Sequence, residues 1–155
     1  MSAPSAGEVT AETSALPGER AVRRVLGASV VVMIAFWTAW YGHRSLVASG
    51  TSQSYYDFEN AFPLADLWLT TCLFAGLWTL PRRHPTALLW ILLGAGGGIY
   101  LFAMDVLYDI EHGVWWKSGG GVVELVINVV TLTVSLFLLR WAWRNRVALL
   151  DHGDR

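Results

Sequence analysis

Four long apolar runs, separated by short polar segments, dominate the chain. Each run is long enough to cross about 30 Å of hydrocarbon at about 1.5 Å per helical residue. Backbone groups in lipid must find partners within their own segment, and no run alternates with the period of two that marks a barrel strand. The pattern therefore predicts an all-α polytopic membrane protein whose four-helix bundle occupies residues 21–146. The predicted transmembrane helices cover residues 24–43, 62–80, 86–109 and 122–143.

The polar segments outside these helices offer little that a core could bury. Residues 1–20 are small, polar and acidic, so we expect a disordered cytoplasmic tail there, and residues 147–155 are expected to form a second cytoplasmic tail. Because residues 1–20 lack the positively charged start of a secretory signal, the first helix is expected to act as an uncleaved anchor. Before the second helix, the tract from Tyr55 to Phe62 repeats apolar side chains at helical spacing, which fits either a short amphipathic helix or an ordinary loop.

Positive charge is distributed unevenly between the two sets of helix ends. On one side of the predicted bundle, the only Lys and Arg residues near the helix ends are Arg44 and Lys117. The other side carries nine arginines: Arg20, Arg23, Arg24, Arg82, Arg83, Arg140, Arg144, Arg146 and Arg155. Since positively charged loops are retained in the cytoplasm, both termini and the turn at 81–85 are expected there, with the loops at 44–61 and 110–120 facing outward.

Composition narrows the class of protein further. Hydrophobic residues make up 54% of the 155 positions and charged residues 15%, with a formal net charge of −1, which excludes a soluble basic protein that binds nucleic acid. The one cysteine, Cys72, excludes a disulfide framework and paired-thiol chemistry within the chain. The nine tryptophans are interpreted as anchors in the membrane interfaces. A composition rich in Ala, Gly, Trp and Arg with a single lysine is typical of a GC-rich bacterial genome, so we expect the bacterial inner membrane, which is the plasma membrane.

Three predicted helices carry a carboxylate at a similar depth near their outer ends. Asp66 lies about one turn into the second helix, Asp105 about one turn from the end of the third, and Glu124 near the start of the fourth. A carboxylate at the bilayer centre costs about 2.5–3.5 kcal/mol, and less near the interface, so each requires a partner or a wet cavity. At about 100° per residue, Asp105 shares a face with Gly94 and Gly98, whose lack of a side chain favours close approach of another helix.

These positions predict an acidic cavity that opens to the outer leaflet and binds a cation or a cationic amphiphilic ligand. Asp105 and Glu124 are expected to carry the binding, with Asp66 as a third wall. Asn128, one turn deeper than Glu124, is expected to orient the ligand by hydrogen bonding, and Arg44 is the expected internal counter-charge. The expected rim, with Asp109 and His112 at the entrance, comprises Asp57, Glu59, Asp109, Glu111 and His112.

The same groups offer a metal ion as an alternative occupant. Asp105, Asp109, His112 and Glu124 supply the oxygen and nitrogen donors that a divalent cation such as Mn²⁺, Zn²⁺ or Ca²⁺ accepts. Neither a Glu-x-x-His pair nor a His-Glu-x-x-His sequence occurs in the chain, which argues against carboxylate-bridged di-iron and zinc-protease sites.

Three other functions also fit the sequence, and in each of them the protein contacts membrane lipids. Polar side chains in membrane bundles also fix helix register, at about 0.6 kcal/mol each, which favours a structural or accessory subunit that meets a membrane partner protein. The polar stripe of Glu124, Asn128, Thr131 and Ser135 fits proton or ion transport by a homo-oligomer. Carboxylates that perturb one another's pKa also suit acid/base catalysis on a lipid or sterol-like substrate. In outline, the four-helix architecture resembles the small four-helix sterol isomerase and sigma-2 receptor group.

Overall fold

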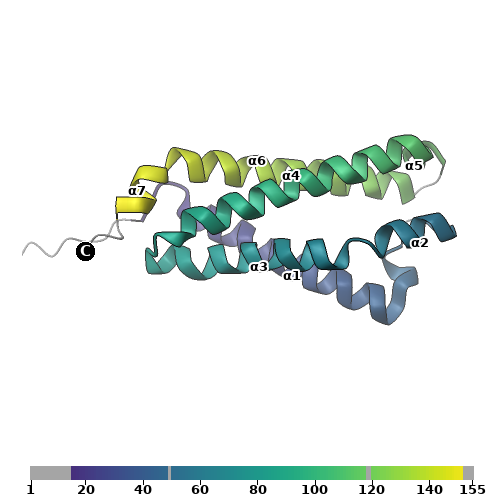
Figure 1. Cartoon of the computed structure of the whole chain (residues 1–155), viewed down its shortest axis with the longest axis horizontal. Coiled ribbons are helices and arrows are strands. Elements are labelled where there is room, and N and C mark those ends of the chain that lie inside the picture. The colour runs from purple at the N-terminus through teal and green to yellow at the C-terminus, as the bar shows by residue number, and fades with distance from the viewer. Residues whose placement is uncertain (1–14, 49, 118–119, 152–155) are drawn as a thin grey trace, which may run out of the picture.

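The structure, a computed structural model, describes residues 15–48, 50–117 and 120–151 (Figure 1). Within this part of the chain every regular element is a helix, which confirms the predicted all-α fold. Each predicted apolar run forms one long helix. These helices are α1 (Glu19–His43), α3 (Pro63–Thr79), α4 (Thr86–His112) and α6 (Gly120–Arg144).

Short helices connect or extend the long ones. They are η1 (Arg44–Leu46), α2 (Gln53–Glu59), η2 (Leu80–Arg82), α5 (Val114–Lys117) and α7 (Arg146–Leu150). The tract left open between a helix and a loop forms α2, which Ser52 caps by accepting the N–H of Tyr55 at 3.2 Å.

The two predicted tails are shorter than expected where the structure describes them. α1 already begins at Glu19, and α7 lies almost entirely within the expected C-terminal tail and buries Leu149. The remainder of the two tails, residues 1–14 and 152–155, lies outside the described residues.

The bundle has two chemically different ends. The start of α1, η2 and α7 lie at one end, which we call the basic end; α2 and α5 lie at the other, the acidic end (Figure 1). Two contacts join the segments at the basic end. The indole Nε1 of Trp141 donates to the carbonyl of Pro17 at 2.7 Å, and Arg83 pairs with Glu19 at 2.8 Å. Both described chain termini therefore lie at the basic end.

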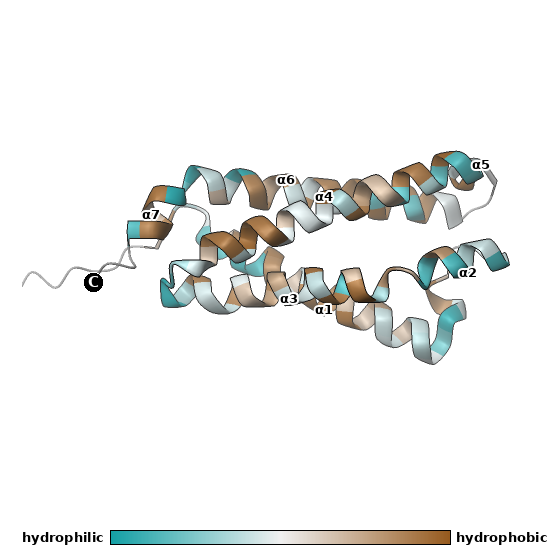
Figure 2. Cartoon of the chain, viewed as in Figure 1, coloured by the Kyte–Doolittle hydropathy of each residue, from teal (hydrophilic) through white to brown (hydrophobic). Residues whose placement is uncertain are grey.

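The four long helices, α1 counted with η1 and α3 with α2 and η2, have the length and apolar composition needed to cross a membrane. In the most apolar stretch of each, only 17–33% of the residues are buried inside the protein. Large apolar side chains such as Val31, Val126 and Leu64 are instead exposed on the outside of the bundle. Hydrophobic residues recur along all four long helices (Figure 2). Such a surface suits hydrocarbon and not water, which indicates a helical membrane protein.

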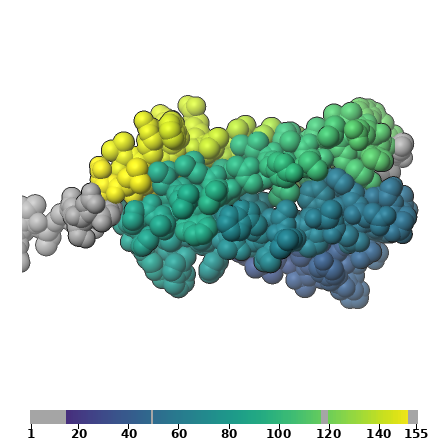
Figure 3. All heavy atoms as spheres, in the orientation of Figure 1, coloured from purple at the N-terminus to yellow at the C-terminus, as the bar shows by residue number. Residues whose placement is uncertain are grey.

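α4 is the central helix because it packs along both α3 and α6, whereas α1 packs mainly on α3 and touches α6 only slightly. Side chains of α3 and α4 meet along the face seen in Figure 3. The core contains Leu26 of α1, Leu73 of α3, Ile91 of α4 and Leu138 of α6, each at most 4% exposed. The weak contact between α1 and α6 leaves the bundle open along that side.

Gly94 and Gly98 confirm the close packing predicted for α4. A Cβ atom at Gly98 would collide with Oγ of Ser135 on α6, and one at Gly94 would lie 3.1 Å from Cδ2 of Leu73 on α3. One face of α4 therefore admits two neighbouring helices at short range. The Gly98 contact also fixes the heights of α4 and α6 relative to each other.

Replacing Gly98 by alanine is expected to lower the free energy of unfolding in detergent by about 1–3 kcal/mol, because α6 must move away from the new methyl group. Gly96 is the matched control, since a Cβ there meets nothing within 4 Å. Gly96→Ala should stabilise the helix by about 0.5–1 kcal/mol. Adding Ser135→Gly to Gly98→Ala should recover most of the loss. Equal effects of the two alanines on denaturant unfolding would contradict this account of the packing.

Candidate functional site

Five carboxylates gather at the acidic end of the bundle, and we call them the acidic cluster. They come from α2, α3, α4 and α6: Glu59, Asp66, Asp105, Asp109 and Glu124. Glu59 interacts electrostatically with Glu124, Asp105 and Asp66, and Asp105 and Asp109 each interact with Glu124 as well. The structure thus brings together the three carboxylates expected to line the cavity, and adds Glu59 and Asp109 to them.

Neutral donors hold three of these carboxylates in place. Trp37 of α1 donates its indole N–H to Asp66 at 2.9 Å, and Trp115 of α5 donates to Asp109 at 2.8 Å. Tyr55 of α2 makes a longer hydrogen bond of 3.4 Å to Glu124. Each donor comes from a different helix than its carboxylate, so these bonds tie α1, α2 and α5 to the body of the bundle.

Asn128 is the most deeply buried polar side chain of the site, at 1% exposed. Its Nδ2 donates to Oδ2 of Asp109 at 2.9 Å. Its Oδ1 is buried and accepts no hydrogen bond from any described residue. A buried acceptor without a donor is costly, so this oxygen marks a place where a donor from outside the chain would be favourable.

Aromatic side chains fasten α2 over the acidic end. Phe58 stacks on Tyr108 of α4 with ring centroids 3.8 Å apart, and Trp40 of α1 packs edge to face against Tyr55. The indole N–H of Trp40 also donates to Asn60 at 3.2 Å, just after α2 ends. These contacts place Glu59, the last residue of α2, beside the carboxylates of the long helices.

Arg44 does not serve as the counter-charge that the sequence suggested. Its guanidinium lies over the rings of Trp40 and Tyr56, 4.9 and 5.0 Å from their centroids. Among the described residues the one ion pair joins Arg83 to Glu19, at the opposite end. The aromatic rings compete for Arg44 because α2 folds back beside the end of α1, which the sequence left undecided.

The expected metal site is also not formed. Asp105, Asp109, His112 and Glu124 all lie in the described part of the chain, and no three His, Cys, Asp or Glu side chains there converge on one point. His112 is exposed and stacks on Tyr108 at 4.0 Å, with Nδ1 3.0 Å from that residue's carbonyl oxygen. Asp109 is not at an entrance either, since it is only 5% exposed. Asp109 and His112 are one helical turn apart on α4, but α5 covers Asp109 and leaves His112 exposed.

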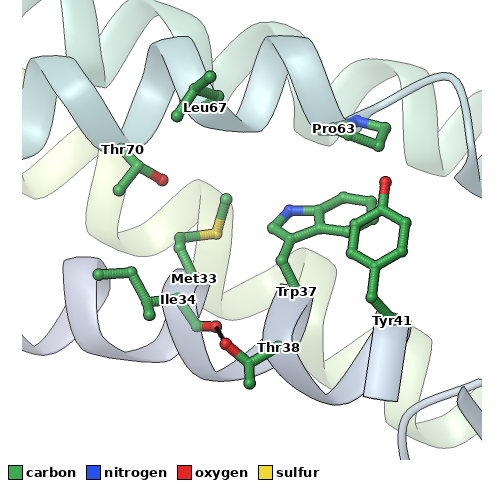
Figure 4. Close-up of a pocket in the computed structure, with 8 residues that line it drawn as sticks. All are labelled: Met33, Ile34, Trp37, Thr38, Tyr41, Pro63, Leu67 and Thr70. Carbon is green, nitrogen blue, oxygen red and sulfur yellow. Dashed lines mark hydrogen bonds between the residues drawn. The ribbon is translucent and has the colours of Figure 1, made fainter. Parts of the chain in front are cut away.

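Two grooves run along the bundle near the acidic cluster. The α1–α3 groove, with a volume of about 540 Å³, lies between Met33, Trp37 and Tyr41 on α1 and Pro63 and Leu67 on α3 (Figure 4). Its Trp37 is the residue that donates to Asp66. This groove is open to the surroundings, since Tyr41 and Leu67 are both more than 60% exposed.

The α1–α6 groove is smaller, about 290 Å³, and penetrates to the centre of the bundle. Gly98 forms part of its wall, and Thr131 and Ser135 are its polar side chains on α6. Met33 lines both grooves, so they adjoin each other at α1. The volume lies at the lower limit of ordinary small-molecule sites.

Residues of the α1–α6 groove and of the acidic cluster lie on the same faces of α3, α4 and α6. A carboxylate and a groove residue that are seven positions apart lie on nearly the same face, about 10 Å apart along the helix axis. Three helices show this spacing: Asp66 with Leu73, Asp105 with Gly98, and Glu124 with Thr131. The cluster therefore stands at the end of the groove that points toward α2 and α5.

The sequence analysis placed Glu59 only at the rim of the acidic cavity. It gave no role to Tyr55, Trp37 and Trp115 as hydrogen-bond donors. The helical spacing between Tyr55 and Glu59 was the available signal, because it puts both side chains on one face of α2. Trp37 and Trp115 were interpreted only as interfacial anchors, whereas each holds a carboxylate. Asp57 and Glu111, also expected at the rim, are exposed.

These features define an all-helical protein with four candidate membrane spans, an acidic cluster at one end and a groove below it. Comparison with protein-family models, curated proteins and solved structures finds no match for this chain.

Proposed function

We propose that this protein binds a cationic amphiphile at the acidic end of the bundle, with the charged head at the acidic cluster and the apolar body in the α1–α6 groove. The observation that carries the proposal is the gathering of five carboxylates from four helices without a basic partner among the described residues. Neutral donors reach Asp66, Asp109 and Glu124, and they stabilise negative charge there without neutralising it.

Electrostatics gives the reason a cation is favoured. Removing a carboxylate from water costs several kcal/mol, and like charges repel more strongly as the surroundings become less polar. A bound cation offsets both costs at once. Because the carboxylates come from separate helices, the cation would also hold α2, α3, α4 and α6 together.

The groove favours an amphiphile over a small inorganic ion. Leu69, Leu73 and Leu138 give it an apolar lining suited to a hydrocarbon chain, and the carboxylate pairs seven residues apart align it with the cluster. An organic ammonium group needs no tight shell of ligands, which agrees with the lack of a three-ligand metal group in the described residues.

In our proposal the basic end faces the cytoplasm of a bacterium, with both termini inside, and the acidic end faces outward from the plasma membrane. The support is the charge distribution: Arg20, Arg24, Arg82 and Arg144 all belong to the basic end and are exposed. Arginine near helix ends is retained in the cytoplasm. The ligand would then enter from the outer leaflet.

Dodecyldimethylammonium is expected to raise the Tm of the protein in neutral detergent, whereas dodecanol of equal chain length is not. At about 100 times Kd a ligand contributes about 2.7 kcal/mol, which for a chain of this size corresponds to roughly 5–10 °C. Asp105→Asn combined with Glu124→Gln should reduce this shift to less than about one third, because it removes two carboxylates from the cluster.

Glu111→Gln is the matched control, since it removes an exposed carboxylate of α4 that does not belong to the acidic cluster. It should leave the shift unchanged. An equal shift with dodecanol would reject recognition of charge. If neither compound shifts the Tm of the unaltered chain, while the double variant folds normally, a structural or accessory role is favoured instead.

A further inference from the structure

We propose that Oδ1 of Asn128 selects amphiphiles whose charged nitrogen carries an N–H group over quaternary ammonium compounds. This inference rests on the proposed binding of a cationic amphiphile, and it names the chemical class of the head: a protonated primary, secondary or tertiary amine. The two observations behind it are the buried acceptor on Asn128 and its place along α6, between Glu124 of the acidic cluster and Thr131 of the groove wall.

The orientation of the Asn128 amide is set by Asp109. The carboxylate of Asp109 accepts hydrogen bonds, and it already receives one from Trp115 at 2.8 Å and one from Nδ2 of Asn128 at 2.9 Å. Rotating the amide by half a turn would place two oxygens against each other, which is unfavourable. Asn128 therefore presents its nitrogen to Asp109 and keeps Oδ1 as a free acceptor among the described residues.

The position of Asn128 matches that of a head group at the top of the groove. Glu124 of the cluster lies one turn before it on α6, and Thr131 of the groove wall lies about one turn after it. Asn128 is 1% exposed, so its acceptor has almost no access to bulk solvent. A chain lying in the groove would bring its terminal nitrogen to this level.

An N–H group on that nitrogen would pair with Oδ1 while the positive charge remained close to the carboxylates. A trimethylammonium head carries the same charge but presents only methyl groups, so it would cover Oδ1 without satisfying it. A hydrogen bond to a charged group, together with the cost of a buried unpaired acceptor, corresponds to a preference of about tenfold or more.

The test compares dodecyldimethylammonium with dodecyltrimethylammonium on the full chain in neutral detergent. The two probes have the same chain and the same charge at neutral pH, and differ in one N–H that is replaced by N–CH₃. A change in tryptophan fluorescence reports binding, since Trp37 and Trp115 hydrogen-bond to the cluster. Titrations of the Asp105→Asn, Glu124→Gln double variant supply the background from partition into the micelle. We expect Kd for the first probe to be lower by about tenfold or more.

A second arm assigns the preference to Asn128. In a chain with Asn128→Leu and Asp109→Asn, the acceptor is gone and no carboxylate is left at position 109, so the preference should fall to within about twofold. Thr133→Ala is the matched control on α6, because the Thr133 hydroxyl bonds only to its own helix, at Val129, and the preference should persist.

The outcomes separate this inference from the proposed function. Equal Kd values in the unaltered chain, or tighter binding of the trimethyl probe, would overturn the role of Asn128 while leaving cation binding intact. Failure of both probes to bind would overturn both. A tenfold preference that survives removal of Asn128 would also overturn it, since the selectivity would then arise elsewhere. If the Asn128→Leu, Asp109→Asn variant does not fold, equal Kd values for the two probes in the unaltered chain would still overturn the inference.

Discussion

Replacing Asn128 by leucine is expected to lower the free energy of unfolding by about 3 kcal/mol. The leucine cannot donate to Asp109, whose buried carboxylate would keep only the hydrogen bond from Trp115. Hydrogen bonds to charged groups contribute about 1.5–3 kcal/mol, and removing one partner from a buried charged group costs about 3–5 kcal/mol. Denaturant unfolding of the purified protein in neutral detergent, without added amphiphile, measures the loss.

Adding Asp109→Asn to the Asn128→Leu variant should recover at least half of the lost free energy of unfolding. The neutral amide still accepts from Trp115 and needs no second donor. Thr133→Ala, on an exposed part of the same helix, should change stability by less than about 0.5 kcal/mol. A leucine variant as stable as the original chain would mean that the bond between Asn128 and Asp109 contributes nothing, and would remove the basis for the amide orientation.

Replacing Glu19 by alanine is expected to cost about 2 kcal/mol, the second largest effect. Glu19 is 6% exposed, pairs with Arg83 at 2.8 Å and accepts the N–H of Leu16 at 3.0 Å. It also lies in the first turn of α1, where a negative charge interacts favourably with the helix dipole. The alanine therefore loses one buried ion pair and one hydrogen bond.

Arg82→Ala provides the comparison, since Arg82 is exposed and lies over the ring of Trp78 instead of pairing with a carboxylate. Its loss should be below about 1 kcal/mol. Glu19→Ala and Arg83→Ala combined should cost clearly less than the sum of the single changes, because both remove the same pair. Additive losses in thermal unfolding would show that the ion pair is not a stabilising contact.

The sequence predicted the long helices well because their signal is local. A run of about twenty apolar residues has few alternatives to a helix, and observed bounds such as Pro63–Thr79 lie close to the predicted 62–80. The ends of the helices were less predictable from the sequence. α4 continues to His112, beyond the expected 109, and α7 forms where a tail was expected, because Leu149 finds a buried place at the basic end.

The candidate site was predictable only in part. Helix phase and depth placed Asp66, Asp105 and Glu124 at one level, since both follow from residue spacing alone. Spacing could not show that α2 would fold back and add Glu59 to this group. It also could not show that Arg44 would lie against Trp40, because the choice between a carboxylate and a ring depends on which side chains meet.

By itself the sequence determined the helical class of this protein, its four apolar spans and the uneven placement of positive charge, because composition, run length and period depend only on neighbouring residues. The tertiary structure decided which groups meet. It paired Asn128 with Asp109, set aromatic donors on the carboxylates and left α1 apart from α6, so that a groove runs below the acidic cluster. These relations join residues far apart along the chain, and only the packing of whole helices determines them.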